Sequence, residues 1–359
     1  MRIFIIEPYY GGSHKQWADS YKNQSNNEVR IYNLPARHWK WRMEGAAIEL
    51  ARQLNQSSEI PNLIVVTDFL NLPLFKSLIN KVFRDVVTVV YFHENQFSYP
   101  FSVKEKHTES KDHFAFMNYT SALVADQVYF NSEYNKKSFF DGLNTLLLKL
   151  PDFKNQENVP ALELKSKVLP VGVQLSEEEL DVTSDKQGVT LLWNHRWEYD
   201  KNPLGFINVL KSFNKSSFKL NICGEKGRYW PNEFDQIKAE FADQLNHYGY
   251  VKSRADYIDL LRVSDFMPVT SNQEFFGISV VEGAYYGVIP ILPKRLSYLE
   301  LFSDFPMLFY DQEKEVSKVV QDLVPYQDEI RARLKQFMKQ YDWSNIAKSY
   351  DHEFGLLIN

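Results

Sequence analysis

Short apolar segments recur along this chain in two sets, and each is followed by a stretch long enough to form a helix. The segments are rich in β-branched and aromatic residues, which favour strands. The first set comprises RIFIIE (2–7), VRIYNL (29–34), NLIVVTD (62–68), VVTVVYFHE (86–94), DQVYFNS (126–132) and KVLPVGV (167–173). The second set comprises VTLLWNH (189–195), FKLNICG (218–224), HYGYV (247–251), DFMPVT (265–270) and VIPILP (288–293). This alternation predicts βα units and parallel sheets.

The two sets of segments predict two domains. Residues 174–187 (QLSEEELDVTSDKQ) lie between the sets and are polar and acidic without an apolar period, which indicates a linker. We expect an α/β protein with an N-terminal Rossmann-like domain over 1–174 and a C-terminal one over 188–340, facing a central cleft. The last segment, about 341–359, is expected to pack back on the first domain. A chain of 359 residues is long enough for two such cores.

Composition excludes several classes of protein. Hydrophobic residues are 44% and charged residues 24%, which predicts a folded chain rather than a disordered one. The single cysteine rules out an internal disulfide, and the eight histidines lack H-x3-H or HExxH spacing, so no metal site is expected. The first apolar run is too short for a signal peptide, and none reaches the roughly 18 residues of a membrane helix. We therefore expect a cytoplasmic protein without stable membrane insertion; the sequence does not specify an oligomeric state.

Charge is distributed unevenly along the chain. The net charge of −5 argues against a protein whose whole surface binds nucleic acid. Residues 1–175 carry 20 Lys+Arg and 18 Asp+Glu, whereas the remainder carries 21 and 28. Because the excess negative charge lies in the second half, a local basic patch in the first half is compatible with the composition.

The segment PARHWKWRMEG (35–45) interleaves cations with tryptophans. Arg37, Lys40 and Arg42 can contact phosphates, while Trp39 and Trp41 can stack on bases. In a strand, the tryptophans would share one face and the cations the other. An ordinary amphipathic segment with tryptophan in the core explains the same pattern, so the residues alone leave both interpretations open.

In open βα sheets, ligands bind beyond the carboxyl ends of the strands, and two motifs of the first domain lie there. In YYGGSHK (9–15), Gly11 and Gly12 allow close approach of the backbone, and the following helix offers N–H groups to a phosphate. A tight strand–helix turn would explain the same glycines. His93, in YFHENQFSYP (91–100), can act as an acid or base or bind a sugar hydroxyl, although a structural histidine is the alternative.

The second domain begins with NHRWEYDKNP (194–203), in which Arg196 and Lys201 bracket a helix start expected at Asp200. Arginine can bind a diphosphate through two parallel hydrogen bonds, and lysine can add a point charge. A surface ion pair of Arg196 with Glu198 or Asp200 is the alternative.

The stretch EFFGISVVE (274–282) is expected to be a loop followed by a helix that begins near Gly277. Glu274 would then lie in the loop and Glu282 in the helix. Eight helical residues rise about 12 Å, which is the scale of a nucleoside diphosphate sugar. One carboxylate could bind ribose hydroxyls and the other sugar hydroxyls, although two glutamates at this spacing also occur by chance.

These motifs occur in the order typical of a retaining GT-B glycosyltransferase of the family 4 type. More specifically, the chain resembles the tRNA-queuosine α-mannosyltransferase family. The blocks that carry the resemblance are MRIFIIEPYYGGSHKQ, LPARHWKWR, VVYFHENQFSYP, LVADQVYFNSEYNKKSF, WNHRWEYDKNP, HYGYV and EFFGISVVEGAYYG. The resemblance implies a GT-B fold, GDP-mannose as the donor, no bound metal or other cofactor, and queuosine in a tRNA anticodon as the acceptor.

The resemblance also implies roles for individual residues. Glu274 would hold the transferred sugar, and His93 would lie near the reacting centre, so these two are the expected catalytic residues. The residues expected to bind the donor are Gly11, Gly12, Arg196, Lys201, Phe276, Gly277, Ile278 and Glu282. The residues expected to bind the acceptor or its tRNA are His14, Arg37, Trp39, Lys40, Arg42, Glu94 and Asn95.

Two other functions stay open. A transferase acting on a lipid or polysaccharide would need an apolar or amphipathic surface, which FLNLPLFKSLINKVF (69–83) would supply unless it is a buried helix. A sugar-nucleotide sensor, or an epimerase on the same fold, would bind the donor and transfer nothing to an acceptor.

Overall fold

The structure is a computed structural model, and it describes residues 1–99, 111–176, 188–227 and 230–358. Its contacts divide the chain into two compact units. Unit 1 comprises Met1–Gly172 and Trp343–Asn359, and unit 2 comprises Val173–Asp342. Most of the expected linker, from residue 177 to 187, lies outside the described residues.

Unit 1 is a parallel sheet covered by helices. Its strands are β1 (Arg2–Tyr10), β2 (Glu28–Pro35), β3 (Leu63–Thr67), β4 (Val87–Phe92), β5 (Gln127–Phe130) and β6 (Ser166–Val168). Its helices are α1 (Gly12–Gln24), α2 (Trp39–Asn55), α3 (Leu72–Leu78), α4 (Lys81–Arg84), α5 (Lys111–Val124), α6 (Glu133–Lys149), α7 (Asn158–Leu164) and α15 (Trp343–Leu356). The strand order is β2-β1-β3-β4-β5-β6, and the neighbouring strands pair in parallel. The order reverses between β1 and β3, the kind of switch point where open α/β sheets bind ligands.

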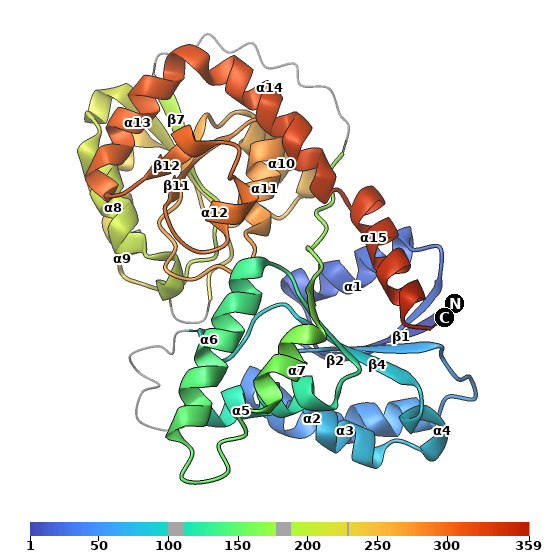
Figure 1. The fold of residues 1–359 in the computed structure, drawn as a ribbon. Coiled ribbons are helices and arrows are strands. Elements are labelled where there is room, and N and C mark those ends of the chain that lie inside the picture. Colours follow the sequence, from blue (N-terminus) through green and yellow to red (C-terminus); the bar gives the residue numbers. More distant parts are fainter. Residues whose placement is uncertain (100–110, 177–187, 228–229, 359) are drawn as a thin grey trace. The chain divides into compact units, whose positions relative to one another are not determined.

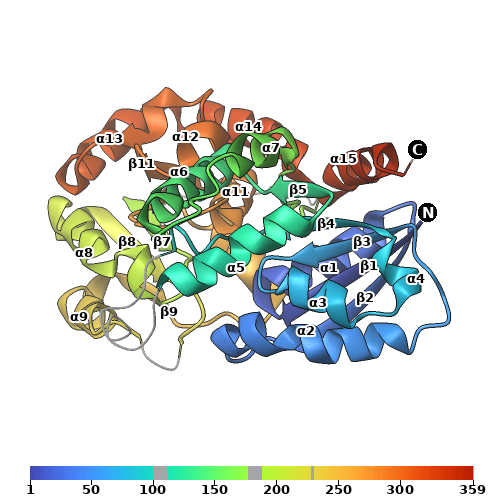
Figure 2. The same cartoon turned by 60° about the horizontal axis from the view of Figure 1, so that its bottom comes forward.

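The two faces of this sheet are buried by different helices, because successive side chains of a strand point to opposite faces. Phe4 and Ile6 belong to the core that includes residues of α2, α3, α5 and α6, and Figure 2 shows α2 lying along β1 and β2. On the opposite face, α15 lies beside α1 (Figure 1). There Trp17 stacks on Tyr91 at 5.0 Å, and its indole N–H donates to the Tyr350 hydroxyl at 3.0 Å. The C-terminal helix is therefore part of the core of unit 1.

Unit 2 repeats this architecture. Its strands are β7 (Val189–Trp193), β8 (Phe218–Ile222), β9 (Leu245–Tyr248), β10 (Phe266–Pro268), β11 (Ile289–Pro293) and β12 (Phe309–Tyr310). Its helices are α8 (Pro203–Ser212), α9 (Glu233–Glu240), α10 (Arg254–Arg262), α11 (Ile278–Tyr285), α12 (Tyr298–Leu301), α13 (Val316–Leu323) and α14 (Gln327–Met338). The described strands pair in parallel in the order β12-β11-β10-β7-β8-β9, so the switch point lies between β7 and β10.

Two local expectations differ from the structure. At the helix start expected at Asp200 there is only a 3-10 turn (Tyr199–Lys201). The α-helix α8 begins at Pro203, because the side chain of Asn202 accepts the N–H of Gly205 at 3.1 Å and proline suits the first helical position. The segment 35–45 does not continue as a strand beyond Pro35, the last residue of β2, since α2 begins at Trp39. In a helix, residues two positions apart point in different directions, so the two tryptophans do not share a face.

The segment 69–83 forms α3 and α4, and its side chains Leu72, Phe75 and Phe83 are buried in the core of unit 1. These three side chains are therefore not available to a lipid surface, whereas Leu78 and Val82 of the same segment are exposed. None of the helices in the described part of the chain has the length and apolar character required to cross a membrane.

Candidate functional site

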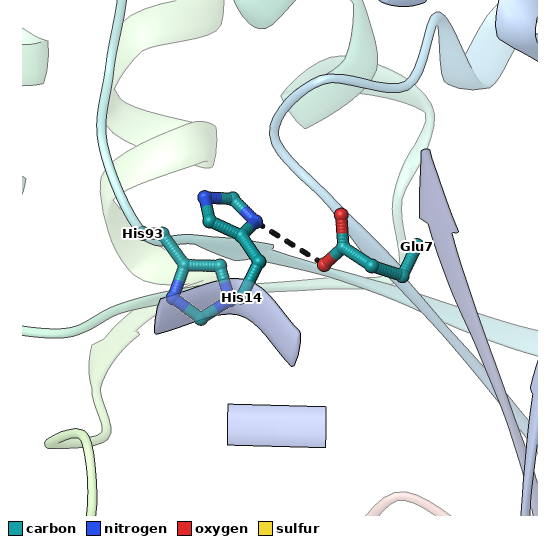
Figure 3. Close-up of side chains that lie close together, drawn as sticks. All are labelled: Glu7, His14 and His93. Carbon is teal, nitrogen blue, oxygen red and sulfur yellow. Dashed lines mark hydrogen bonds and ion pairs between the residues drawn. The ribbon is translucent and has the colours of Figure 1, made fainter. Parts of the chain in front are cut away.

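The switch point of unit 1 brings together a buried carboxylate and two histidines (Figure 3). Glu7 lies near the carboxyl end of β1, fully buried, and accepts the N–H of Tyr9 at 2.8 Å. Its Oε2 lies 3.2 Å from Nδ1 of His14 in the first turn of α1. The ring of His14 lies beside that of His93, which follows β4, with centroids 4.3 Å apart. We call Glu7, His14, Asp68 and His93 the unit 1 cluster.

The charges in this cluster set the two histidines in opposite protonation states. Burial lowers the pKa of His14, but the Glu7 carboxylate and its hydrogen bond, together with Asp68 and Glu94, raise it to about 9. Burial, together with the charge of His14, holds the pKa of His93 well below its ordinary value. Burial also raises the pKa of Asp68 well above its usual range. Near neutral pH, a cationic imidazole therefore lies next to a neutral one.

His93 is fixed in place by its surroundings. Its backbone N–H donates to Oδ1 of Asp68 at 3.2 Å, and its carbonyl accepts the amide of Asn131 at 2.8 Å. The rings of Trp17 and Tyr91 lie at right or steep angles to the imidazole, each 4.8 Å away. Its buried Nε2 has no hydrogen-bond partner among the described residues. A rigid neutral imidazole with an available nitrogen can bind or deprotonate a substrate hydroxyl.

Glu7, His14 and His93 also have ligand atoms within 4.8 Å of one another, a grouping that could hold a metal ion. Two imidazoles and a carboxylate are ligands of the kind that zinc binds. A metal ion on His14 would compete with the proton that Glu7 stabilises, because a histidine ligand must be deprotonated. In the structure, His14 and Glu7 form a hydrogen-bonded pair.

The glycine pair that begins α1 contacts the β2–α2 loop. A Cβ at Gly11 would lie 2.4 Å from Cβ of Ala36, so glycine is required for the two loops to approach each other. Gly12 has a φ of +51° and is the first residue of α1. Gly12 lies two residues before His14, so the glycine pair leads directly into the unit 1 cluster.

Glu94 and Asn95, the two residues that follow His93, have different environments. Glu94 is half-buried and accepts the amide of Gln96 at 2.9 Å. Asn95 is fully buried, its amide donates to Oδ1 of Asn135 at 2.8 Å, and its Oδ1 accepts the N–H of Phe97 at 3.1 Å. Through these hydrogen bonds, Asn95 stabilises the loop that follows β4.

The cations and the indole that were expected to bind tRNA lie at the start of α2. Arg37 is exposed, and Nζ of Lys40 lies 5.7 Å from the centre of the Trp39 ring. Trp39 is half-buried between two phenylalanine rings, with centroids 6.2 and 5.3 Å away. Arg42 folds back, and its Nε and Nη2 donate to the Pro35 carbonyl at 3.2 and 3.1 Å. Trp39 and Arg42 therefore stabilise the segment itself.

At the switch point of unit 2, Lys201 and Glu274 are brought together although they belong to different loops. Nζ of the buried Lys201 lies 3.1 Å from Oε2 of Glu274 and 3.1 Å from Oδ2 of Asp200, and it donates to the Gln273 carbonyl at 3.0 Å. Burial lowers the pKa of Lys201, but Glu274 and Asp200 more than compensate and raise it. Glu274 is therefore held by a permanent positive charge.

The loop after β10 turns into α11 through Gly277, whose φ of +103° favours glycine. Phe276 is buried, and its carbonyl accepts the hydroxyl of Ser297 at 2.8 Å. Ile278 is the first residue of α11 and is half-exposed. The helix therefore begins where the sequence predicts it, with its first N–H groups following the glycine.

A cavity of about 420 Å³ lies beyond the carboxyl ends of β7, β8 and β9. Its lining residues are Asn194, Arg196, Cys223, Gly224, Glu225, Tyr250, Val251, Lys252, Ser253, Arg254 and Tyr257. Three of these side chains are cations and one is acidic, which suits an anionic ligand. Arg196 forms an ion pair with Glu198 at 3.3 Å, and Glu282 on α11 forms one with Arg254. The surface pair considered for Arg196 is therefore present, although Arg196 also lines the cavity.

The end of β7 is bonded to the first turn of α11. The amide of Asn194 donates to the Ser279 carbonyl at 2.9 Å and to the Tyr257 hydroxyl at 3.2 Å. Nδ1 of His195 lies 3.1 Å from the Ser279 hydroxyl, and burial together with the charge of Lys201 lowers the pKa of His195 to about 3. His195 is therefore neutral, and it joins the end of β7 to the first turn of α11.

The expected donor residues of unit 2 thus form two groups, one around Lys201 and Glu274 and one around the cavity. Residues that the motif analysis did not select are Glu7 and Asp68 in unit 1, and Lys252 and Arg254 in unit 2. Glu7 lies near the carboxyl end of β1, Asp68 directly follows β3, and Lys252 and Arg254 lie between β9 and the first turn of α10. The rule that ligands bind beyond the carboxyl ends of strands favours this edge of each sheet.

Comparison with known proteins identifies this architecture. A family model described as the N-terminal region of tRNA-queuosine alpha-mannosyltransferase matches residues 2–173, and the model of glycosyl transferases group 1 matches residues 177–340. Among solved structures, the N-terminal domain of trehalose-6-phosphate phosphatase from Candida albicans aligns with a TM-score of 0.72 at 12% identity, covering 100% of this chain and 97% of that chain. HepE from Anabaena in complex with UDP aligns with a TM-score of 0.69 at 14% identity, covering 99% and 100%.

Two sequence relatives extend the comparison. The tRNA-queuosine alpha-mannosyltransferase of Drosophila melanogaster is 30% identical over 358 residues, covering 96% of this chain and 93% of the relative. A GDP-mannose:cellobiosyl-diphosphopolyprenol alpha-mannosyltransferase of Xanthomonas oryzae is 25% identical over 205 residues, 52% of this chain and 53% of the relative. The protein is a hexosyltransferase with the GT-B fold. Within that class, the chain belongs to the tRNA-queuosine alpha-mannosyltransferase family, which confirms the resemblance and the predicted fold class.

Proposed function

We propose that this enzyme transfers mannose from GDP-mannose to queuosine in tRNA. The observation that carries the proposal is the family match over residues 2–173, because this part of the chain contains the unit 1 cluster. The Drosophila relative, which aligns with this chain over nearly its whole length, is named tRNA-queuosine alpha-mannosyltransferase. The choice of donor is supported by the Xanthomonas relative, whose name specifies GDP-mannose.

The donor would bind in unit 2. The cavity presents Arg196, Lys252 and Arg254, whose charges suit a diphosphate. Glu282, held by Arg254 beside the cavity, would accept the ribose hydroxyls. Glu274, held by Lys201, would accept hydroxyls of the mannose. The proposal includes no metal ion, because these cations supply the positive charge that a leaving diphosphate requires.

The reaction would replace one bond at the anomeric carbon of mannose with another. The bond from this carbon to the diphosphate oxygen breaks, and a bond to the queuosine hydroxyl oxygen forms on the same face of the sugar. The hydroxyl proton passes to the leaving diphosphate, so the products are mannosyl-queuosine in tRNA and GDP. His93 would lie near the reacting centre, where its Nε2 has no hydrogen-bond partner among the described residues. An α-linked product from an α-linked donor makes the transfer a retaining one.

A tRNA acceptor implies a cytoplasmic enzyme, and we include that location in the proposal. A polyprenol-linked acceptor is the main competitor, because the Xanthomonas relative is named for one. The two differ in where the acceptor is found: in a nucleic acid or in a membrane.

The test is to incubate the full chain with GDP-mannose and one of three acceptors. These are tRNA that contains queuosine, the same tRNA with unmodified guanosine, and vesicles that contain a polyprenol-linked glycan. We expect a nucleoside heavier by one hexose only with the first, detected by mass spectrometry. UDP-glucose in place of GDP-mannose is the donor control. Transfer to the vesicles, or to neither tRNA, would contradict the proposed acceptor.

A further inference from the structure

The two tryptophans of the segment 37–42 have different environments. Trp39 packs against aromatic rings of unit 1, whereas Trp41 is 63% exposed. An indole this exposed on a folded domain leaves a large apolar surface in water, which marks a binding site when its surroundings fit a ligand. The sequence could not separate the two, because both are flanked by cations.

The exposed indole of Trp41 packs against the backbone of its own helix. A Cβ added at Gly45 would lie 2.9 Å from Cζ2 and 3.0 Å from Cε2 of Trp41, so the indole lies against the helix one turn further along α2. Glycine at position 45 leaves the space that the ring fills. An aromatic side chain held in this way loses little conformational freedom when a flat ligand stacks on it.

The charges around Trp41 favour a polyanion. Arg37 is exposed, Lys40 lies in the first turn of α2, and that turn contains no acidic residue. The nearest acidic residue along the helix is Glu44, whose Oε1 lies 2.6 Å from Nε2 of His113. The positive end of the α2 dipole adds to the same field.

This segment also lies next to the unit 1 cluster. Ala36 contacts the glycine pair, since a Cβ at Gly11 would lie 2.4 Å from its own Cβ. Trp39 packs on Phe69 at 6.2 Å, and Phe69 packs on His14 at 5.4 Å. A chain of packed side chains therefore joins the start of α2 to the histidine that Glu7 holds.

We infer that Trp41 is a stacking platform for an unpaired base of the acceptor tRNA, with the exposed Arg37, four residues earlier in the chain, to bind a backbone phosphate. This inference rests on the proposed function and adds a contact outside the reacting centre. Unpaired bases of RNA loops stack on exposed aromatic side chains while adjacent cations bind phosphates, and the anticodon that carries queuosine lies in such a loop. Trp39 and Arg42 support the platform from within unit 1.

The test uses the full chain and the variants Trp41→Ala, Trp41→Phe and Ile48→Ala. Ile48 is 60% exposed on the same helix and serves as the matched control for loss of exposed apolar surface. We expect Trp41→Ala to raise the Kd for queuosine-containing tRNA by roughly 5- to 100-fold, the range for one stacked base. Trp41→Phe should retain part of the affinity, Ile48→Ala should bind as the wild type does, and GDP-mannose affinity should not change in any of them.

Several outcomes would overturn the inference. Trp41→Ala that binds tRNA as tightly as the wild type would overturn it. Ile48→Ala that loses as much tRNA affinity would overturn it as well, because the loss would then not be specific to the indole. A loss of GDP-mannose affinity in Trp41→Ala would reveal a general folding defect. Trp41→Phe with normal donor binding would then decide: a partly reduced tRNA affinity supports stacking, and wild-type tRNA affinity overturns it. Wild-type protein that binds tRNA through Trp41 but transfers no mannose would overturn the proposed function alone. Wild-type protein that binds no tRNA would overturn both.

Discussion

Replacing Glu7 by glutamine should change the protonation state of the unit 1 cluster. Glu7 is fully buried, and its Oε2 lies 3.2 Å from Nδ1 of His14. Burial alone lowers the pKa of His14, and it is the carboxylate of Glu7, with further help from Asp68 and Glu94, that raises the pKa to about 9. In Glu7→Gln, burial still opposes the charge but its main counter-charge is absent. The pKa of His14 should fall to or below the value of about 6.5 found in unfolded chains.

The loss of stability in Glu7→Gln, and its dependence on pH, follow from the pKa values of His14 in the folded and unfolded chain. A fall from about 9 to about 6.5 corresponds to about 3 kcal/mol of lost interaction with the protonated ring. Since the pKa of His14 is higher in the folded than in the unfolded chain, this stabilisation is fully present below about pH 6.5 and is lost as the pH rises through about 9. The free energy of unfolding of the wild type should therefore exceed that of Glu7→Gln, and the excess should be largest at the acidic end of this window. Toward the alkaline end the excess should shrink.

NMR of protein with labelled histidine gives the decisive measurement. The variant His14→Gln identifies the His14 signal, whose titration midpoint is followed in the wild type and in Glu7→Gln. Chemical unfolding at the two ends of the pH window measures the stability difference. Glu49→Gln is the control, because Glu49 lies in an exposed pair with Arg52 and its removal should leave His14 unchanged. A His14 midpoint that stays near 9 in Glu7→Gln would refute the reasoning.

Three further predictions concern the donor site and the C-terminal helix. Glu274→Gln keeps the shape of the side chain that the buried Lys201 holds, but it removes the negative charge. Turnover should therefore fall at least about tenfold, with little change in donor Kd. A changed donor Kd with normal turnover would contradict this prediction. Glu282→Ala frees Arg254 and should mainly weaken donor binding, measured by GDP-mannose titration, and equal small effects of both glutamate variants would refute the two roles. Tyr350→Phe removes the hydroxyl that accepts the indole N–H of Trp17 and donates to the Pro170 carbonyl, so both groups lose a partner in the core of unit 1. The free energy of unfolding should therefore fall by about 1–3 kcal/mol. An unchanged thermal melt would show that these hydrogen bonds contribute nothing to stability.

The fold class was accessible from the sequence because strands and helices leave periodic marks. The alternation of apolar segments predicts parallel sheets, and Gly277 marks the start of α11, as the structure has it. The start of α8 was missed because Asn202 in a left-handed conformation delays it, a choice made by a local cap rather than by periodicity. The short strand β12 was missed as well, since Phe309–Tyr310 has too few residues to show a pattern.

The environment of a side chain was much less accessible. Trp39 and Trp41 occur in the same basic stretch, but α2 points one toward the core of unit 1 and the other toward water. Arg37 and Arg42 likewise have the same charge, but only Arg42 is used to bind a carbonyl of its own loop. Such differences depend on which neighbours the fold supplies, and a linear pattern does not contain them.

The sequence by itself determined the strands, the polar residues that follow them and the family motifs, because these depend on neighbours along the chain. Only the tertiary structure decided that Glu7, His14, Asp68 and His93 form one cluster, since β1, β3 and β4 are adjacent in the sheet but far apart in sequence. In that cluster the Glu7 carboxylate makes His14 cationic by raising its pKa, whereas burial and the charge of His14 lower the pKa of His93 and keep it neutral. The same side chains in an extended chain would be hydrated and would titrate alike, because water would screen their charges from one another.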